Sequence, residues 1–255
     1  MKLLGSDYDG TLRYGTDVME EDIEAIRRWR DAGNLFAIVT GRSGESIRNE
    51  MEKYGLECDY LVCNNGGFVF QGDERLYENY MDTLTAVDVI YALKETPGVC
   101  SIMVNDGMTR HKIEVDNGLE DHRYADKKPD LSEEEVLSLP KYGQIVASCM
   151  DDDKAIELAE MINHFFGDQL QAFPNNTCVD VVAKGVNKGE GLIFAAAYAG
   201  LDEDDVYVIG DSYNDLPMIE AVPNSAVMAI APEDLQQQAF MICGGLKDLI
   251  DQIME

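Results

Sequence analysis

The chain has 255 residues, of which 45% are hydrophobic and 27% charged, and this composition is that of an ordinary globular protein with one large or two modest domains. Its formal net charge of −29 argues against nucleic acids and anionic membranes as partners, because both bind clustered Lys and Arg. We interpret the acidity as a solvated surface that keeps the protein soluble, so an anionic substrate would need local cations.

The N-terminus and the cysteines indicate where the protein works. The first ten residues carry one Lys and no long apolar stretch, so we expect no signal peptide, and no window reaches the roughly 18 apolar residues of a spanning helix. The six cysteines lack paired spacing, so we expect buried free thiols at Cys58, Cys63, Cys100, Cys149, Cys178 and Cys243. A cytoplasmic protein is therefore expected.

Short apolar runs, each followed by a polar or Gly-rich turn, predict strands that are buried on both faces of a parallel sheet. These runs are Leu35–Val39, Tyr60–Cys63 and Val206–Ile209. Helical periodicity predicts helices at Glu20–Ala32, after a Ser43 cap as far as Gly55, and at Asn187–Ala199. Strands that alternate with helices predict a doubly wound, Rossmann-like α/β sheet.

The middle third predicts a different architecture. Its expected helices are Thr83–Glu95 and Asp152–Phe166, and its expected strands are Ser101–Val104, Met108–Val115, Gln144–Cys149 and two more that end near Val182. The Asn-Asp-Gly segment between the first two strands indicates a hairpin. We therefore expect an α+β domain at residues 81–181, inserted into a core domain made of residues 1–80 and 182–255.

Two carboxylates follow the first expected strand, at the kind of sheet edge where α/β proteins bind ligands. Asp7 and Asp9 are two residues apart in an extended segment, so their side chains lean the same way. Such carboxylates repel each other, and a divalent cation removes the conflict; hard oxygen ligands suit Mg²⁺. The alternative is a strand that simply ends in an Asp-rich turn.

A phosphate group could be held at two further positions. Thr40 and Gly41 offer a hydroxyl and an unhindered N–H at the start of a helix, where anions bind, although many strand-to-helix turns look alike. Lys188 opens a predicted helix, where a cation opposes the helix dipole, so it fits an anion better than it fits helix stability. Lys184 is the rival candidate, and an exposed surface lysine is the plain alternative.

Polar side chains also follow the expected strand that ends at Ile209. Asp211 could complete a metal site, Asn214 could donate to phosphate, and Asp215 could orient Lys188 or a metal-bound water. Helix capping is the alternative for all three, since Asp and Asn are good caps.

Taken in this order, the four motifs resemble those of the haloacid dehalogenase superfamily. DYDGT is similar to its first motif, TGR to its second, Lys188 in GVNKGEG to its third, and GDSYND to its fourth. The inserted domain falls where the Cof-type members, with a class IIB cap, carry that cap. The NNGG segment at residues 64–67 loosely resembles the family's NGA-like segment.

The resemblance implies roles for these residues. Asp7 corresponds to the nucleophile and Asp9 to the general acid and base. Mg²⁺ would be bound by Asp7, the Asp9 backbone carbonyl and Asp211. Phosphate would be bound by the remaining motif residues Thr40, Gly41, Lys188 and Asn214. The third-motif Lys opens its helix, which favours Lys188 over Lys184.

The implied function is a Mg²⁺-dependent phosphatase that hydrolyses a small phosphate ester through an aspartyl-phosphate on Asp7. Sugar phosphates are the first expectation, with FMN or pyridoxal phosphate as cofactor substrates, and the enzyme is expected as a monomer or homodimer. A second aspartate at position 9 argues against a dehalogenase, because the dehalogenase reaction has no leaving alcohol that needs a proton. The alternatives are a phosphomutase and a non-catalytic phospholigand-binding protein of the same fold.

The cap is expected to close over the site and to contact the substrate beyond its phosphate. Four polar residues on or near its hairpin could face the substrate, but we expect them to be ordinary solvent-facing side chains: Asn105, Arg110, His111 and Lys112.

Overall fold

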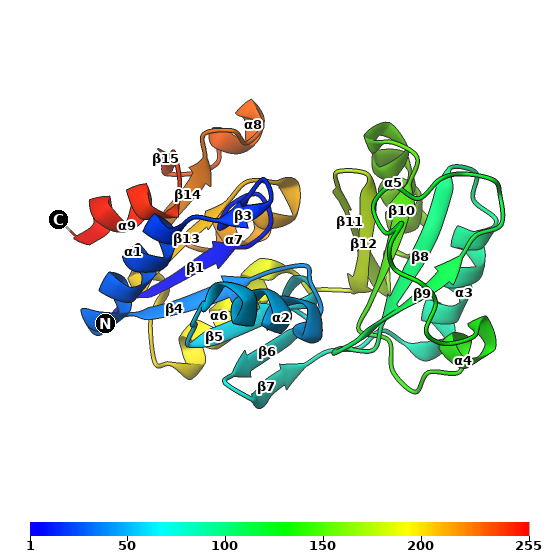
Figure 1. The fold of residues 1–255 in the computed structure, drawn as a ribbon, viewed down its shortest axis with the longest axis horizontal. Coiled ribbons are helices and arrows are strands. Elements are labelled where there is room, and N and C mark those ends of the chain that lie inside the picture. Colours follow the sequence, from blue (N-terminus) through cyan, green and yellow to red (C-terminus); the bar gives the residue numbers. More distant parts are fainter. Residues whose placement is uncertain (255) are drawn as a thin grey trace. The chain divides into compact units, whose positions relative to one another are not determined.

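An eight-stranded sheet in the order β15-β14-β13-β1-β4-β5-β6-β7 forms the centre of one unit of the computed structural model, which describes residues 1–254 (Figure 1). The six strands from β15 to β5 run parallel, and β6 is antiparallel to β5. The strands are β1 (Leu3–Asp7), β4 (Leu35–Val39), β5 (Tyr60–Cys63), β6 (Phe68–Gln71), β7 (Glu74–Glu78), β13 (Val206–Gly210), β14 (Asn224–Met228) and β15 (Met241–Cys243). The predicted α/β class with a parallel sheet is confirmed.

Helices connect these strands. They are α1 (Glu20–Asp31), α2 (Gly44–Tyr54), α6 (Lys188–Tyr198), α7 (Leu216–Ala221), α8 (Glu233–Gln236) and α9 (Leu246–Met254), with 3-10 turns η1 (Asn64–Gly66), η2 (Glu203–Asp205) and η3 (Tyr213–Asp215). A short ribbon of β2 (Arg13–Tyr14) and β3 (Asp17–Val18) follows β1. The buried Trp29 docks α1 on the sheet, because its indole N–H donates to the carbonyl of Leu35 at 2.7 Å.

The second unit is built on a five-stranded sheet in the order β11-β12-β10-β8-β9, whose neighbouring strands are all antiparallel. Its strands are β8 (Val99–Asn105), β9 (Arg110–Glu114), β10 (Gln144–Cys149), β11 (Leu170–Asn175) and β12 (Cys178–Ala183), and its helices are α3 (Thr83–Lys94), α4 (Glu133–Leu137) and α5 (Asp152–Phe166). A continuous apolar core joins α3 and α5 to this sheet through side chains such as Ile90, Leu158 and Val181.

The unit boundaries differ by a few residues from the expected domain at 81–181. The second unit comprises Ser43–Ser46 and Glu78–Val186, and the rest of the chain forms the first unit. It extends past residue 181 because β12 continues to pair with β11 as far as Leu170 opposite Ala183.

The hairpin differs from its prediction in detail. Its second strand begins at Arg110, not Met108, because the Asp106 carboxylate accepts the backbone N–H of Met108 and of Thr109, both at 2.9 Å. The expectation of solvent-facing side chains is wrong for three of the four hairpin residues, since Asn105, His111 and Lys112 are buried and Arg110 is half-buried. The Nζ of Lys112 donates to the Tyr124 carbonyl at 2.8 Å, so the polar stretch that follows the hairpin covers it.

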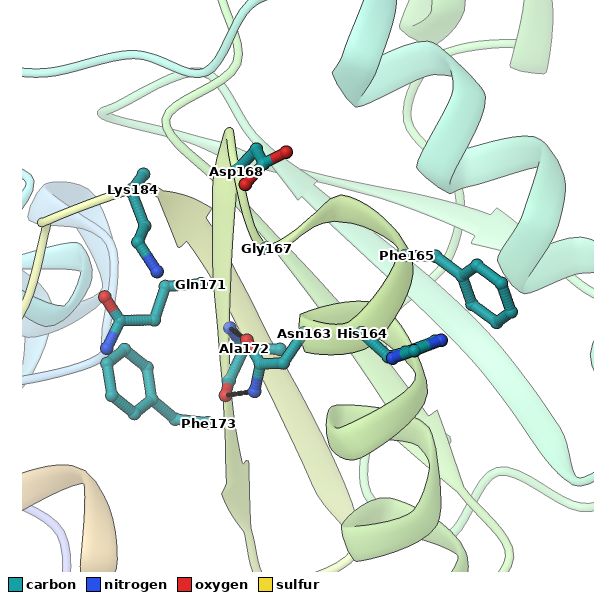
Figure 2. Close-up of a pocket in the computed structure, with 9 residues that line it drawn as sticks. All are labelled: Asn163, His164, Phe165, Gly167, Asp168, Gln171, Ala172, Phe173 and Lys184. Carbon is teal, nitrogen blue, oxygen red and sulfur yellow. Dashed lines mark hydrogen bonds between the residues drawn. The ribbon is translucent and has the colours of Figure 1, made fainter.

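A hollow in the second unit lies at the end of α5 and is lined by residues of α5, β11 and the segments that flank β11 and β12 (Figure 2). Asn163, which lines it, has a structural role: its amide donates to the Ala172 carbonyl and accepts the Ala172 N–H, both at 2.9 Å. Lys184 and Asp168 are exposed at the same hollow. Lys184, the rival to Lys188, therefore lies in the second unit as an ordinary surface lysine.

All six cysteines are free thiols, and five of them are buried as expected, whereas Cys58 is only half-buried. Across residues 1–254, no helix combines the length and the apolar composition that crossing a membrane requires.

Gly66, in the NNGG segment, allows the chain to pass closely beside the start of α6. Its φ is +97°, and a Cβ atom there would lie 1.9 Å from the carbonyl oxygen of Asn187. We expect Gly66→Ala to lower the free energy of unfolding by about 2–4 kcal/mol, from the left-handed backbone together with overpacking. Urea denaturation measures this.

The matched control is Gly72→Ala, which has a φ of +58° but open space around the added Cβ. Gly72→Ala should lower the free energy of unfolding by only about 1 kcal/mol, the cost of placing an alanine in a left-handed backbone conformation. Equal losses in the two variants would show that the approach to Asn187 carries no energetic weight.

Candidate active site

The carboxyl ends of β1 and β13 lie side by side and place two aspartates together. Ser6 pairs with Ile209 in parallel register, so Asp7 and Asp211 leave the sheet at the same edge. Gly10 turns the chain at a φ of +104°, and a Cβ there would lie 2.3 Å from Oδ2 of Asp211. The Thr11 hydroxyl donates to Oδ1 of Asp211 at 2.9 Å. The turn after β1 thus packs directly against Asp211.

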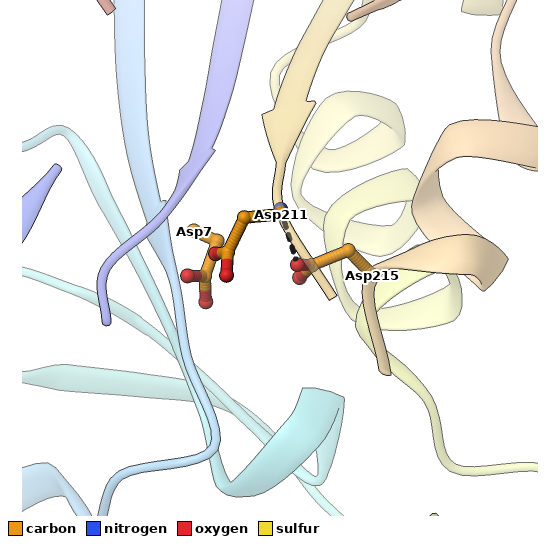
Figure 3. Close-up of side chains that lie close together, drawn as sticks. All are labelled: Asp7, Asp211 and Asp215. Atoms are coloured by element: carbon orange, nitrogen blue, oxygen red, sulfur yellow. Dashed lines mark hydrogen bonds between the residues drawn. The ribbon is translucent and has the colours of Figure 1, made fainter. Parts of the chain in front are cut away.

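Three carboxylates converge at this edge: Asp7, Asp211 and Asp215 (Figure 3). One oxygen from each lies within 4.8 Å of the others. Asp7 and Asp215 are buried, and Oδ2 of Asp7 has no hydrogen-bond partner among residues 1–254. In Figure 3 the carboxylates of Asp7 and Asp211 lie side by side, and the Asp215 carboxylate accepts the backbone N–H of Asp211.

The three neighbouring carboxylates repel one another, and a bound cation would relieve this repulsion. Burial, together with repulsion from Asp215 and Asp211, raises the pKa of Asp7 well above its usual value, although Lys188 opposes this shift. Burial and the nearby Asp215 raise the pKa of Asp211 to about 6. Buried carboxylate oxygens, one of them unpartnered, form the hard-oxygen donor set that Mg²⁺ prefers. The residues therefore fit a magnesium ion.

Lys188 supplies a buried positive charge beside the carboxylates. It is the first residue of α6, after the Asn187 cap, whose side chain accepts the Glu190 N–H at 2.9 Å. Its Nζ donates to Oδ1 of Asp7 at 2.6 Å and to Oδ1 of Asp215 at 2.5 Å, and the residue is 1% exposed. Burial alone would lower the pKa of Lys188, but Asp215 and Asp7 raise it, so the ammonium stays charged.

Asp215 contacts both the backbone that follows β13 and the side chain of Lys188. Its Oδ2 accepts the backbone N–H groups of Asp211 at 2.9 Å and Ser212 at 3.0 Å, which is a capping function. Its Oδ1 accepts Lys188. Asn214 is buried as well; its amide donates to Oδ1 of Asn65 at 3.3 Å and its own Oδ1 accepts the Ser212 hydroxyl at 2.7 Å.

Thr40 and Gly41 follow β4, one position beyond the pair Asp7 and Val39. Thr40 is buried, and its hydroxyl oxygen accepts the Arg42 N–H at 3.1 Å. Its backbone carbonyl accepts the Asn65 N–H at 3.0 Å, which ties this turn to η1. The two residues thus lie at the same sheet edge as Asp7, in a turn that is held by its neighbours.

Asp9 has a neighbour to which the sequence analysis gave no role. Arg42, the last residue of TGR, donates from Nε to Oδ2 of Asp9 at 2.6 Å and from Nη2 to Oδ1 at 2.7 Å. The position of Arg42 next to Thr40 and Gly41 in the TGR motif indicated that it lies near the site. Nothing in the local pattern indicated which carboxylate it would bind.

Comparison with known proteins places this geometry in context. A family profile described as haloacid dehalogenase-like hydrolase matches residues 4–248. A 5-amino-6-(5-phospho-D-ribitylamino)uracil phosphatase from Bacillus subtilis is 23% identical over 100% of this chain and 98% of its own length. A pyridoxal phosphate phosphatase from Escherichia coli is 25% identical over 95% of this chain and 93% of its own.

Solved structures agree on the fold. The structure of a sugar phosphatase of haloacid dehalogenase subclass IIB superposes with a TM-score of 0.81 at 21% identity, and the match covers 100% of this chain and 98% of that one.

Proposed function

Because the chain belongs to the family of haloacid dehalogenase-like hydrolases, we propose that it is a Mg²⁺-dependent phosphatase that acts through an aspartyl-phosphate on Asp7. The observation that carries this proposal is the contact of Lys188 with Asp7 inside a cluster of three aspartates. A buried ammonium beside a buried carboxylate suits a group that must receive and release a phosphoryl anion. The phosphatase names of two relatives support the same class, a phosphoric monoester hydrolase.

The proposed reaction has two steps. An oxygen of Asp7 attacks phosphorus as the bond from phosphorus to the leaving oxygen breaks, and Asp9 gives that oxygen a proton. Asp9 then takes a proton from water, whose oxygen attacks phosphorus and frees Asp7 and inorganic phosphate. Mg²⁺, held by Asp7, the Asp9 carbonyl and Asp211, would neutralise phosphoryl oxygens.

The other motif residues would bind and orient the phosphate. Lys188 supplies the positive charge, while Thr40, Gly41 and Asn214 offer hydroxyl, backbone and amide donors. Asp215 holds Lys188 in place through its 2.5 Å contact and so acts on phosphate indirectly. The second unit would act as the cap that selects the substrate.

The substrate is proposed to be a small phosphorylated metabolite. A sugar phosphate is the first choice, in line with the subclass IIB sugar phosphatase, and a cofactor phosphate such as pyridoxal phosphate or FMN is the next. We propose a cytoplasmic enzyme, active as a monomer or homodimer. The test is phosphate release from p-nitrophenyl phosphate and a panel of sugar and cofactor phosphates. No release from any of them, by folded protein with Mg²⁺, would contradict a phosphatase and favour the mutase or the binding protein.

Metal dependence gives a separate prediction. EDTA should abolish phosphate release and added Mg²⁺ should restore it, because the carboxylate cluster cannot otherwise bind an anion. Asp211→Asn should raise the Mg²⁺ concentration needed for half-maximal rate by about 10-fold or more, since it removes one charged ligand.

The matched control for Asp211 is Asp204→Asn, an exposed aspartate next to β13. It should leave the Mg²⁺ requirement unchanged. Full activity in EDTA after exhaustive dialysis, or an unchanged requirement in Asp211→Asn, would rule out this metal site.

A further inference from the structure

The carboxylate of Asp9 is held by two arginines in the first unit. Arg42 binds both of its oxygens, at 2.6 and 2.7 Å, and Nη1 of Arg13 lies 3.3 Å from Oδ1. The Asp9 side chain is 33% exposed, whereas that of Arg42 is only 18% exposed. An Arg fork that binds a carboxylate through two parallel hydrogen bonds fixes its orientation as well as its position.

Arg42 is in turn held in place by Glu50 on α2. Nη1 of Arg42 lies 3.6 Å from Oε1 of Glu50, and Nε of Arg13 lies 3.6 Å from Oε2. The buried Tyr8 donates its hydroxyl to Oε2 of Glu50 at 2.8 Å, and the Arg42 guanidinium lies 5.0 Å from the centre of the Tyr8 ring. Asp9, Arg42, Glu50 and Arg13 thus form a closed ring of alternating charges, and Tyr8 contacts two of its members, Glu50 and Arg42.

The side chains of this ring are less exposed than those of the ion pairs on the open surface, such as Arg27 with Glu20. Each of its members has a side-chain exposure of 33% or less, and each touches two partners of opposite sign. Exposed ion pairs contribute little and leave both side chains mobile, but a partly buried network with a bidentate member restricts rotation. The residue that it restricts is the one proposed to move protons.

We propose that Arg42 is a positioning residue for Asp9, and that Glu50 secures Arg42 in that role. This inference rests on the proposed function, because it assigns Arg42 to the proton transfers made by Asp9. The contacts with Arg42 and Arg13 are those of the ionised carboxylate, the form that takes a proton from water in the second step. Arg42 holds this carboxylate in one orientation at the turn after β1, and the proton gained from water is the one that Asp9 gives to the leaving oxygen in the next turnover. The geometry required of a general acid is narrow, and loss of orientation is costly in rate.

The leaving group separates this role from phosphate binding and from folding. An alkoxide needs a proton as it leaves, whereas p-nitrophenolate is stable enough to leave without one. The value of kcat/KM reports the first phosphoryl transfer, so a misplaced Asp9 lowers it for alkyl phosphates and spares it for p-nitrophenyl phosphate. A defect in phosphate binding would lower both.

The experiment measures kcat/KM for p-nitrophenyl phosphate and for the fastest alkyl phosphate of the panel, with wild type, Arg42→Ala and Arg42→Lys. We expect Arg42→Ala to lower the alkyl value by about 10²-fold, the lower end of general acid catalysis, and the p-nitrophenyl value by less than about threefold. Arg42→Lys should not restore the alkyl rate, because an ammonium lacks the fork. Glu50→Gln should also lower kcat/KM for the alkyl phosphate relative to kcat/KM for p-nitrophenyl phosphate, by a smaller factor than Arg42→Ala.

A burst gives a second readout. Because Asp9 also takes the proton from water, Arg42→Ala should release p-nitrophenol in a burst that is followed by a slower steady rate. The matched control is Arg48→Ala on α2, whose side chain donates to the Gly72 carbonyl and pairs with the exposed Asp73, away from the ring. It should match wild type with both substrates.

The outcomes separate this inference from the proposed function. The positioning role would be overturned if folded Arg42→Ala and Arg42→Lys lost kcat/KM equally with both substrates, or lost it with neither. The phosphatase proposal would still stand in that case, because it depends on the activity of wild type. No phosphate release by folded wild type from p-nitrophenyl phosphate or from any phosphate of the panel would overturn both. Circular dichroism and thermal melting confirm that each variant is folded, and Glu50→Gln tests the ring should both Arg42 variants be unstable.

Discussion

Replacing Asp7 with asparagine is expected to abolish phosphate release, with a loss of about 10⁴-fold or more in kcat. The amide keeps the shape of the side chain but has no anionic oxygen to attack phosphorus. It also removes one carboxylate from the buried cluster, which relieves repulsion from Asp211 and Asp215. The variant should therefore stay folded while its activity is lost, and release from p-nitrophenyl phosphate measures this directly.

Acid quenching during turnover with labelled substrate adds a direct test of the intermediate. With a label in the phosphoryl group of the substrate, acid-quenched wild type should carry label on the protein, because an aspartyl-phosphate is stable enough in acid to be isolated. Asp7→Asn should carry none, because it lacks the carboxylate that accepts the phosphoryl group. The matched control is Asp31→Asn, an exposed aspartate at the end of α1, which should behave as wild type. Turnover that survives in Asp7→Asn would mean that the nucleophile lies elsewhere.

Replacing Lys188 with methionine is expected to affect both stability and activity. The free energy of unfolding should fall by about 3–5 kcal/mol, because the change leaves two buried carboxylates without their counter-ion. Phosphate binding loses its buried cation, so kcat/KM should fall by about 10²-fold or more. Urea denaturation and phosphate release measure the two effects.

A second substitution distinguishes the counter-ion role from simple packing. Adding Asp7→Asn to Lys188→Met removes one of the stranded carboxylates, so the double variant should recover part of the lost stability. Lys184→Met, at an exposed lysine, is the control and should cost less than about 0.5 kcal/mol. No recovery in the double variant would show that the lysine stem, and not its charge, carries the stability.

The sequence by itself determined most of the elements and the motif order. The predicted strands Leu35–Val39 and Gln144–Cys149 and the helix Asp152–Phe166 coincide with β4, β10 and α5. These segments were predictable because a strand or helix that is buried on one or both faces carries the pattern of its own burial. The short α4 was missed, since it begins inside a polar stretch and buries only Val136.

Only the tertiary structure decided which charges meet. Local pattern could not separate Lys188 from Lys184, yet a distance of 181 residues in sequence is closed to 2.6 Å between Lys188 and Asp7. It likewise could not pair Arg42 with Asp9 and Glu50, nor show that His111 and Lys112 are buried. Periodicity predicts only which side of its own helix or strand a residue occupies. Ion pairs depend on where separate elements meet, and a parallel sheet brings together the ends of strands that are distant in sequence.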